Sequence, residues 1–279
     1  MFFRFFSRSC GSTSLAIGAA VTLAALGMSA QASASEIGIN FTAANSGSSS
    51  SYALTPTDTA GVSGVAQSNW NNLSISDGDA NGISNAGGLT AGTAIDSTGT
   101  MVTGLSVAVA AASGGKVYPT VGDSWGFSGS NLTMQEGEIY PQPEITVLGV
   151  PYSSYDVYVY ATAGSNGGTG SATISIANGA SGTVDPSNTY WYNYGWEGGS
   201  FVQSTATTSA ANTAISNYIV FTGNTTTDFS VAWNGTLSGG WTGISAMQIV
   251  ATPEPTTLGL MGLGGLGVVL VSRKHSTAK

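Results

Sequence analysis

The stretch DGDANG carries three oxygen-bearing side chains at the spacing of a calcium-binding loop. Asp77, Asp79 and Asn81 can place three oxygens on one ion, and the glycine after them permits the sharp turn that such a loop needs. The twelfth position of the pattern is Gly88, whereas an EF-hand has a bidentate glutamate there. Because Asp, Asn and Gly are also common in solvated turns, a calcium site and a plain turn are both open interpretations. No other cofactor is predicted.

The stretch QEGEIYPQPE offers carboxylates for acid–base chemistry. Glu136 and Glu138 are expected on one face of a strand, and Glu144 follows them. A glycosidase holds two carboxyl groups about 5 to 9 Å apart across its sugar substrate. Residues 35–251 contain no arginine and no histidine that could tune these acids. We therefore predict a protein that is not an enzyme, with a carboxylate-based glycosidase or lyase as the alternative.

The composition of residues 35–251 excludes several other kinds of site. Without histidine, the segment can build neither a Ser-His-Asp triad nor a histidine-ligated zinc site. Lys116 is its only positive residue against thirteen acidic ones, which gives a formal net charge of −12. Nucleic-acid binding depends on lysine and arginine contacts to phosphate, so we predict no nucleic-acid partner.

The densest aromatic cluster of the chain is TYWYNYGWEGGSF, residues 189–201. Aromatic faces stack on the apolar faces of sugars, and the Tyr O–H and Trp N–H groups add polar contacts. Side chains alternate along an extended segment, so half of these rings are expected in the core. We predict Trp191 and Trp196 as the exposed pair that stacks on a polysaccharide, with Tyr194 as a hydrogen-bonding neighbour. A purely structural role for the whole cluster is the alternative.

The elements that would position these residues are short strands separated by Gly- and Asn-rich turns. In YDVYVY, for example, Val157 and Val159 point to one face while Tyr158 and Tyr160 point to the other. Between residues 35 and 251 no stretch keeps a 3.6-residue period over ten residues. We predict an all-β jelly roll or β-sandwich, with a β-helix as the alternative. The strands are expected within residues 36–43, 101–115, 144–150, 155–164, 171–179, 200–208, 217–223, 228–235 and 243–251.

The N-terminal segment, residues 1–34, has the three parts of a secretory signal peptide. Two arginines precede an uncharged run at 15–27, and small residues in an A-x-A arrangement end at Ala34. The run is shorter than the roughly 20 apolar residues of a membrane span. Cys10, the only cysteine, precedes the run, so cleavage near Ala34 leaves a mature protein without thiol chemistry.

The C-terminal segment, residues 252–279, combines a proline pair, an apolar stretch and a basic end. Pro253-Glu254-Pro255 precedes an uncharged, glycine-rich stretch at 258–271, and Arg273 and Lys274 follow it. Prolines disfavour helix at the residue before them and separate the stretch from the preceding domain. The stretch is predicted to be a short transmembrane helix, and its basic end a cytoplasmic stop.

This C-terminal pattern resembles the PEP-CTERM sorting signal, which is also labelled ice-binding protein C-terminal domain. The resemblance covers about residues 252–275, and the basic end is thinner here than in many members. It implies an exopolysaccharide-producing Gram-negative bacterium and recognition by an exosortase-type processing enzyme. The chain is then expected at the cell surface or in the extracellular matrix, held in the membrane by its C-terminus before processing.

The preceding domain, residues 35–251, resembles a recurring passenger of PEP-CTERM proteins, which is similar to galactose-binding-like jelly rolls. The similar stretches are INF, SNWNN, IDSTGT, GVPYSSYDVYVY, YIVFTG and GISAMQIV. We therefore predict an exported, non-enzymatic protein with glycan binding as its candidate activity. A structural or adhesive matrix protein without a small ligand is a further alternative; its ice-binding form would need a regular threonine array, which the sequence lacks.

Overall fold

The computed structural model describes residues 35–43, 52–75, 88–111, 118–121, 126–140, 142–163, 170–179, 188–194, 198–235 and 242–252. All of them belong to one compact unit, Ala34–Thr252. The predicted signal peptide and the predicted C-terminal helix therefore lie outside the described residues.

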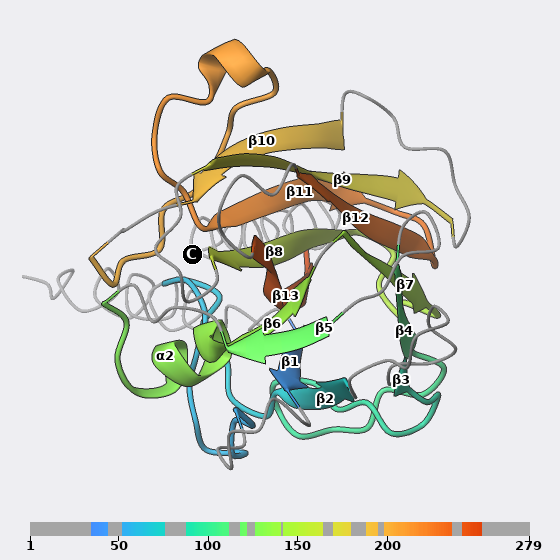
Figure 1. Ribbon diagram of the computed structural model, residues 1–279. Coiled ribbons are helices and arrows are strands. Elements are labelled where there is room, and N and C mark those ends of the chain that lie inside the picture. Colours follow the sequence, from blue (N-terminus) through green and yellow to red (C-terminus); the bar gives the residue numbers. More distant parts are fainter. Residues whose placement is uncertain are drawn as a thin grey trace, which may run out of the picture. The chain divides into compact units, whose positions relative to one another are not determined.

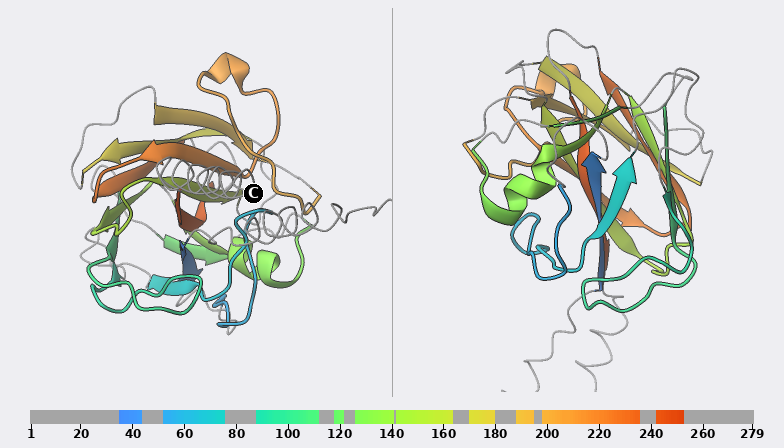
Figure 2. Two further views of the ribbon diagram at one scale, coloured as in Figure 1. Left: turned by 180° about the vertical axis from the view of Figure 1, so that it is seen from behind. Right: turned by 60° about the horizontal axis from the view of Figure 1, so that its bottom comes forward.

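The first sheet has seven strands in the order β11-β8-β13-β1-β2, and β6 pairs with both β13 and β5. β1 and β2 are parallel, as Figure 2 shows in its right-hand view, whereas the other pairs are antiparallel. Its strands are β1 (Glu36–Ala43), β2 (Asn71–Ile75), β5 (Tyr118–Val121), β6 (Gly137–Tyr140), β8 (Tyr155–Ala163), β11 (Tyr218–Asn224) and β13 (Thr242–Ala251).

The second sheet has six antiparallel strands in the order β10-β9-β12-β7-β4-β3 (Figure 1). Its strands are β3 (Gly88–Leu89), β4 (Ser106–Ala111), β7 (Pro143–Leu148), β9 (Gly170–Asn178), β10 (Thr189–Tyr194) and β12 (Phe229–Gly235). Two mostly antiparallel sheets make an all-β sandwich, which confirms the predicted class. The β-helix alternative is wrong.

The main core lies between the two sheets, and strand alternation fills it. Val157 and Val159 of β8 are fully buried in this cluster, and so are Ile174 of β9 and Val231 and Trp233 of β12. Because side chains alternate along a strand, the residues between them face away from this core. On the first sheet, these outward residues meet a second layer.

The second layer packs on the outer face of the first sheet and forms a smaller core. It consists of the segment 52–70 and the helix α2 (Gly129–Glu136), which lies beside β6 in Figure 1. Trp70, Met134 and Tyr160 are its largest buried side chains. The Trp70 ring lies so close to Gly38 of β1 that a Cβ there would come within 2.7 Å of it. Helix α2 has eight residues, too few for a 3.6-residue period to be recognised in the sequence.

The predicted strand at 200–208 is wrong. This segment connects the edge strands of the two sheets, and it makes only isolated bridges, Ala206 to Trp191 of β10 and Gln203 to Tyr218 of β11. It contains Phe, Val and Thr, which are common in strands, but its hydrogen bonds go to two different sheets. After it, the short helix η3 (Ser209–Ala211) projects beyond β10 (Figure 1).

Candidate functional site

A shallow hollow of about 410 Å³ lies on the outer face of the first sheet, over β8 and β11. We call it the tyrosine groove. Tyr158 and Tyr218 line it from the sheet, and the loop 62–65 lines it from the second layer. Its polar side chains include those of Asp156, Gln203 and Thr222. The groove therefore combines two aromatic rings with hydrogen-bonding groups, in a setting that solvent reaches.

The two tyrosines of the groove are held by the alternation of their strands. Tyr158 faces outward because Val157 and Val159 face the core. Its ring lies 13° from parallel with the ring of Tyr218, with centroids 6.5 Å apart, and both side chains are half-buried. Burial raises the pKa of each phenol. Neither hydroxyl has a hydrogen-bond partner among the described residues, so both are available to a ligand.

The loop that forms the other side of the groove is fixed by buried polar side chains. The Tyr160 hydroxyl accepts a hydrogen bond from the Val62 N–H at 3.1 Å and donates to Gln248 Oε1. Gln248 Nε2 in turn donates to the Val65 carbonyl at 2.7 Å. Burial raises the pKa of Tyr160, so this phenol stays protonated. Gly61 has φ +112°, and a Cβ there would lie 2.8 Å from Gln248 Oε1.

Acidic groups lie on the same outer face. Asp156 Oδ1 accepts a hydrogen bond from the Gly223 N–H at 2.9 Å, and its second oxygen has no partner among the described residues. Glu36 lies two strands away in register, with Val250 between them. Burial raises the pKa of Glu36 to about 7. The groove and its surroundings thus carry negative groups, and no described cation lines the groove.

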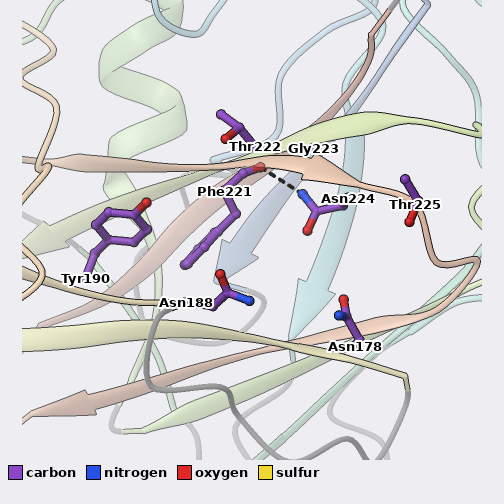
Figure 3. A pocket seen from close by; sticks show the side chains of 8 residues that line it. All are labelled: Asn178, Asn188, Tyr190, Phe221, Thr222, Gly223, Asn224 and Thr225. Carbon is purple, nitrogen blue, oxygen red and sulfur yellow. Dashed lines mark hydrogen bonds between the residues drawn. The ribbon is translucent and has the colours of Figure 1, made fainter. Parts of the chain in front are cut away.

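A second hollow of about 250 Å³ lies where the strands β9, β10 and β11 end or begin. We call it the asparagine cleft. Figure 3 shows Asn178, Asn188 and Asn224 around a common space, with the Tyr190 and Phe221 rings beside them. These two rings meet edge to face, with centroids 5.4 Å apart. None of the residues that line the cleft is charged.

The aromatic residues predicted from the sequence are not brought together by the described structure. Trp191 is half-buried on β10 and faces the outer side of the second sheet, because Tyr192 beside it is in the core. It lines neither hollow. The backbone of Tyr194 ends β10, but its side chain and the whole of Trp196 lie outside the described residues. The predicted stacking role of these three residues stays a prediction.

The calcium-binding interpretation also stays a prediction. Asp77, Asp79 and Asn81 lie outside the described residues. Within the described part of the chain, no group of three or more His, Cys, Asp or Glu side chains could hold a metal ion.

The three glutamates considered for catalysis lie on different elements. Glu136 is the last residue of α2, whereas Glu138 is buried in β6 of the first sheet and Glu144 belongs to β7 of the second sheet. The expectation that Glu136 and Glu138 share one face of a strand is wrong, because the helix ends between them. Burial raises the pKa of Glu136.

Sequence reasoning missed the tyrosine groove, although part of its signal was visible. The alternation of YDVYVY already placed Tyr158 opposite the two core valines. What it could not give was the partner, because Tyr218 lies 60 positions further along and reaches Tyr158 only through the pairing of β11 with β8. The loop 62–65 is equally remote and depends on contacts made by Tyr160 and Gln248.

The described domain belongs to the class of all-β sandwiches, and it bears two hollows suited to a polar ligand. Residues 251–274 match the PEP-CTERM protein-sorting motif, which confirms the resemblance stated for this segment. The motif implies recognition by an exosortase-type processing enzyme, together with export and sorting to the cell envelope. No curated protein and no solved structure matches the chain. Among the described residues no helix is both long and apolar enough to cross a membrane, and the stretch 258–271 lies outside them.

Proposed function

We propose that the chain is an exported, non-enzymatic protein that binds a neutral glycan at the tyrosine groove, at the cell surface or in the polysaccharide matrix. The observation that carries this proposal is the nearly parallel, half-buried pair of Tyr158 and Tyr218 on a rigid sheet. Such rings stack on the C–H faces of sugars, and their free hydroxyls add hydrogen bonds.

The charge of the domain favours a neutral ligand over an acidic one. Among the described residues, Asp156 is the only charged one that lines the groove, and Glu36 lies on the same face. Residues 35–251 carry a net charge of −12. A uronic acid or sulfated polysaccharide would be repelled, because like charges oppose association. A carboxylate such as that of Asp156 is a strong acceptor for the hydroxyl groups of a neutral sugar.

The groove supports binding better than catalysis. A glycosidase places two carboxyl groups across the scissile bond, whereas the described residues that line this groove include a single carboxylate. The hollow is also shallow, with solvent access along the sheet. Weak binding by one groove suffices for a protein of the cell surface, because many copies that engage one polysaccharide gain avidity.

Retention in native gels that contain polysaccharide tests the proposal. We expect the full chain to be retarded by at least one neutral polymer among β-glucan, mannan, galactan and dextran, and not by alginate. Tyr158→Ala should remove the retardation, because it deletes one ring of the pair. Leu148→Ala is the matched control, since Leu148 is an exposed apolar residue of β7 outside both hollows.

Two outcomes would contradict the proposal. If the protein migrates with full mobility in every neutral polymer, the proposed glycan binding is ruled out. Retardation that survives Tyr158→Ala but is lost in Trp191→Ala would move the binding surface to the outer face of the second sheet.

A further inference from the structure

We infer that one glycan chain occupies both the tyrosine groove and the asparagine cleft and crosses β11 at Thr222, so that the ligand is an extended neutral polysaccharide and not a single sugar. This inference rests on the proposed function of the groove. It adds the asparagine cleft as a second binding site, and it specifies that the glycan runs from the groove across β11 into the cleft.

The two hollows are neighbours across one edge strand. Thr222 lines both of them. Figure 3 shows Thr222 on the opposite side of β11 from Phe221, whose side chain points toward the cleft. β11 ends the order of the first sheet and pairs with β8 on one side only. Among the described residues, the bridge along its other side involves Tyr218 alone, so the end of β11 near Thr222 is an open edge.

The strand that separates the two hollows carries a β-bulge, which leaves open space for a ligand to cross it. The register of β11 against β8 shifts between Phe221 and Asn224, and Gly223 has φ +71°. A Cβ built on Gly223 would meet nothing within 4 Å, so the space above this residue is open. Thr222, which lines both hollows, has a small side chain. A sugar chain can therefore cross without displacing a large group.

The same bulge is fixed by residues from both hollows. Asp156 of the groove accepts from the Gly223 N–H at 2.9 Å, and Asn224 Nδ2 of the cleft donates to the Phe221 carbonyl at 2.8 Å (Figure 3). Bulges re-aim a strand and end its pairing, and they recur at sheet edges and beside functional sites. The crossing point is thus held rigid in the free protein, which lowers the cost of ordering it on binding.

Hydrogen-bonding side chains line the cleft as they do the groove. Side-chain amides both donate and accept hydrogen bonds, as sugar hydroxyls do. The side-chain amides of Asn178 and Asn188 make no hydrogen bond to another described residue, and our inference assigns them to the ligand. None of the described residues that line the cleft is charged, so this part of the cleft also favours a neutral ligand. The exposed lining of the cleft is almost entirely polar, so hydrogen bonds would hold a sugar there.

The length of the path sets the size of the ligand. Tyr218 pairs with Tyr160 and Asn224 pairs with Tyr155, so the path runs along five residue steps of β8, which is about 17 Å at about 3.3 Å per residue in a strand. One sugar ring fills only a part of this path. Affinity should therefore grow with the length of the oligosaccharide until both hollows are occupied.

A chain-length series of the polysaccharide retained in the gels tests this inference. Its di-, tetra- and hexasaccharide are titrated calorimetrically into the full chain and into Asn188→Ala, with Asn178→Ala as a second cleft variant. The wild type should bind the hexasaccharide more tightly than the disaccharide. Each cleft variant should weaken hexasaccharide binding about five- to tenfold, as expected for the loss of one or two hydrogen bonds, and leave disaccharide binding unchanged.

The failures of the two proposals differ in this experiment. Equal affinity for all three lengths in the wild type would overturn the two-hollow path and leave the groove proposal intact. A cleft variant that weakens every length equally, with an unchanged melting temperature, would also overturn it. Disaccharide binding that is insensitive to Tyr158→Ala would instead overturn the proposed function.

Discussion

The hydroxyl of Tyr160 holds one wall of the tyrosine groove in place, although Tyr160 does not line the groove. Removing this hydroxyl therefore tests how the wall is positioned without deleting a group that contacts the ligand. In the fold, this hydroxyl accepts from the Val62 N–H and donates to the buried Gln248 Oε1. Tyr160→Phe keeps the ring, which packs in the second core, and deletes only these two interactions.

The expected loss of stability follows from the groups that are left behind. The substitution leaves one backbone donor and one fully buried amide oxygen without a hydrogen-bond partner. Each unpaired group costs about 1 to 3 kcal/mol, so the free energy of unfolding should fall by about 3 kcal/mol. A domain of this size loses about 2 to 4 °C of Tm per kcal/mol, which predicts a decrease of about 6 to 12 °C. The loop 62–65 should also become more mobile, so affinity for the glycan should fall although no contact residue has changed.

Tyr155→Phe is the matched control. Tyr155 is an equally buried tyrosine of the same strand, and its hydroxyl donates one hydrogen bond, to the Thr226 carbonyl at 2.8 Å, away from the groove. This variant should lose about 1 kcal/mol and keep its affinity for glycan. Urea unfolding, with an unchanged m-value, and hydrogen exchange at residues 62–65 measure the two effects. If Tyr160→Phe is no less stable than Tyr155→Phe, and if exchange in the loop is unaltered, the wall is not held in this way.

Three further predictions concern pH, calcium and sorting. Because the folded pKa of Glu36 is about 7 and its ordinary value is 4.5, the folded state binds more protons between these values; the free energy of unfolding should therefore fall as pH rises through this window, and fall less steeply in Glu36→Gln. An equal slope in both proteins would contradict this. If Asp77, Asp79 and Asn81 bind calcium, Tm should rise at millimolar calcium and should not rise in Asp79→Ala. An unchanged Tm of the wild type would rule out the calcium site and leave the plain-turn interpretation. Protein recovered after export should lack the segment after Pro253-Glu254-Pro255 by intact mass, and recovery of peptides that contain Lys274 from the matrix fraction would contradict processing.

Much of the fold could be predicted from the sequence, because its signal is local. The alternation of Val157 and Val159, or of Ile174 and Ile176, needs only neighbouring residues to show which face is buried. The all-β class and the positions of β1, β7, β8, β9, β11, β12 and β13 followed from such patterns. The segment 200–208 is also rich in residues that are common in strands, but its hydrogen bonds are divided between two sheets, which no local signal reveals.

The candidate site was harder to predict, since it depends on contacts between distant segments. The aromatic cluster around Trp191 stood out in composition, and Trp191 lies on the outer face of the second sheet, but its stacking role stays a prediction. Tyr158 and Tyr218 meet only because β11 pairs with β8 in a particular register, and the loop 62–65 joins them only through Tyr160 and Gln248. Such long-range pairings leave no regular spacing in the sequence.

Calorimetric titration of the retained oligosaccharide into Tyr158→Ala, Tyr218→Ala and the double variant tests the central claim most directly. Each ring that stacks on a sugar should contribute about 1 kcal/mol, so each single variant should raise Kd about fivefold and the double variant about 25-fold or beyond detection. Leu148→Ala should bind as the wild type does. Binding by the double variant with the wild-type Kd would contradict the account, because the tyrosine groove would then make no contact with the glycan.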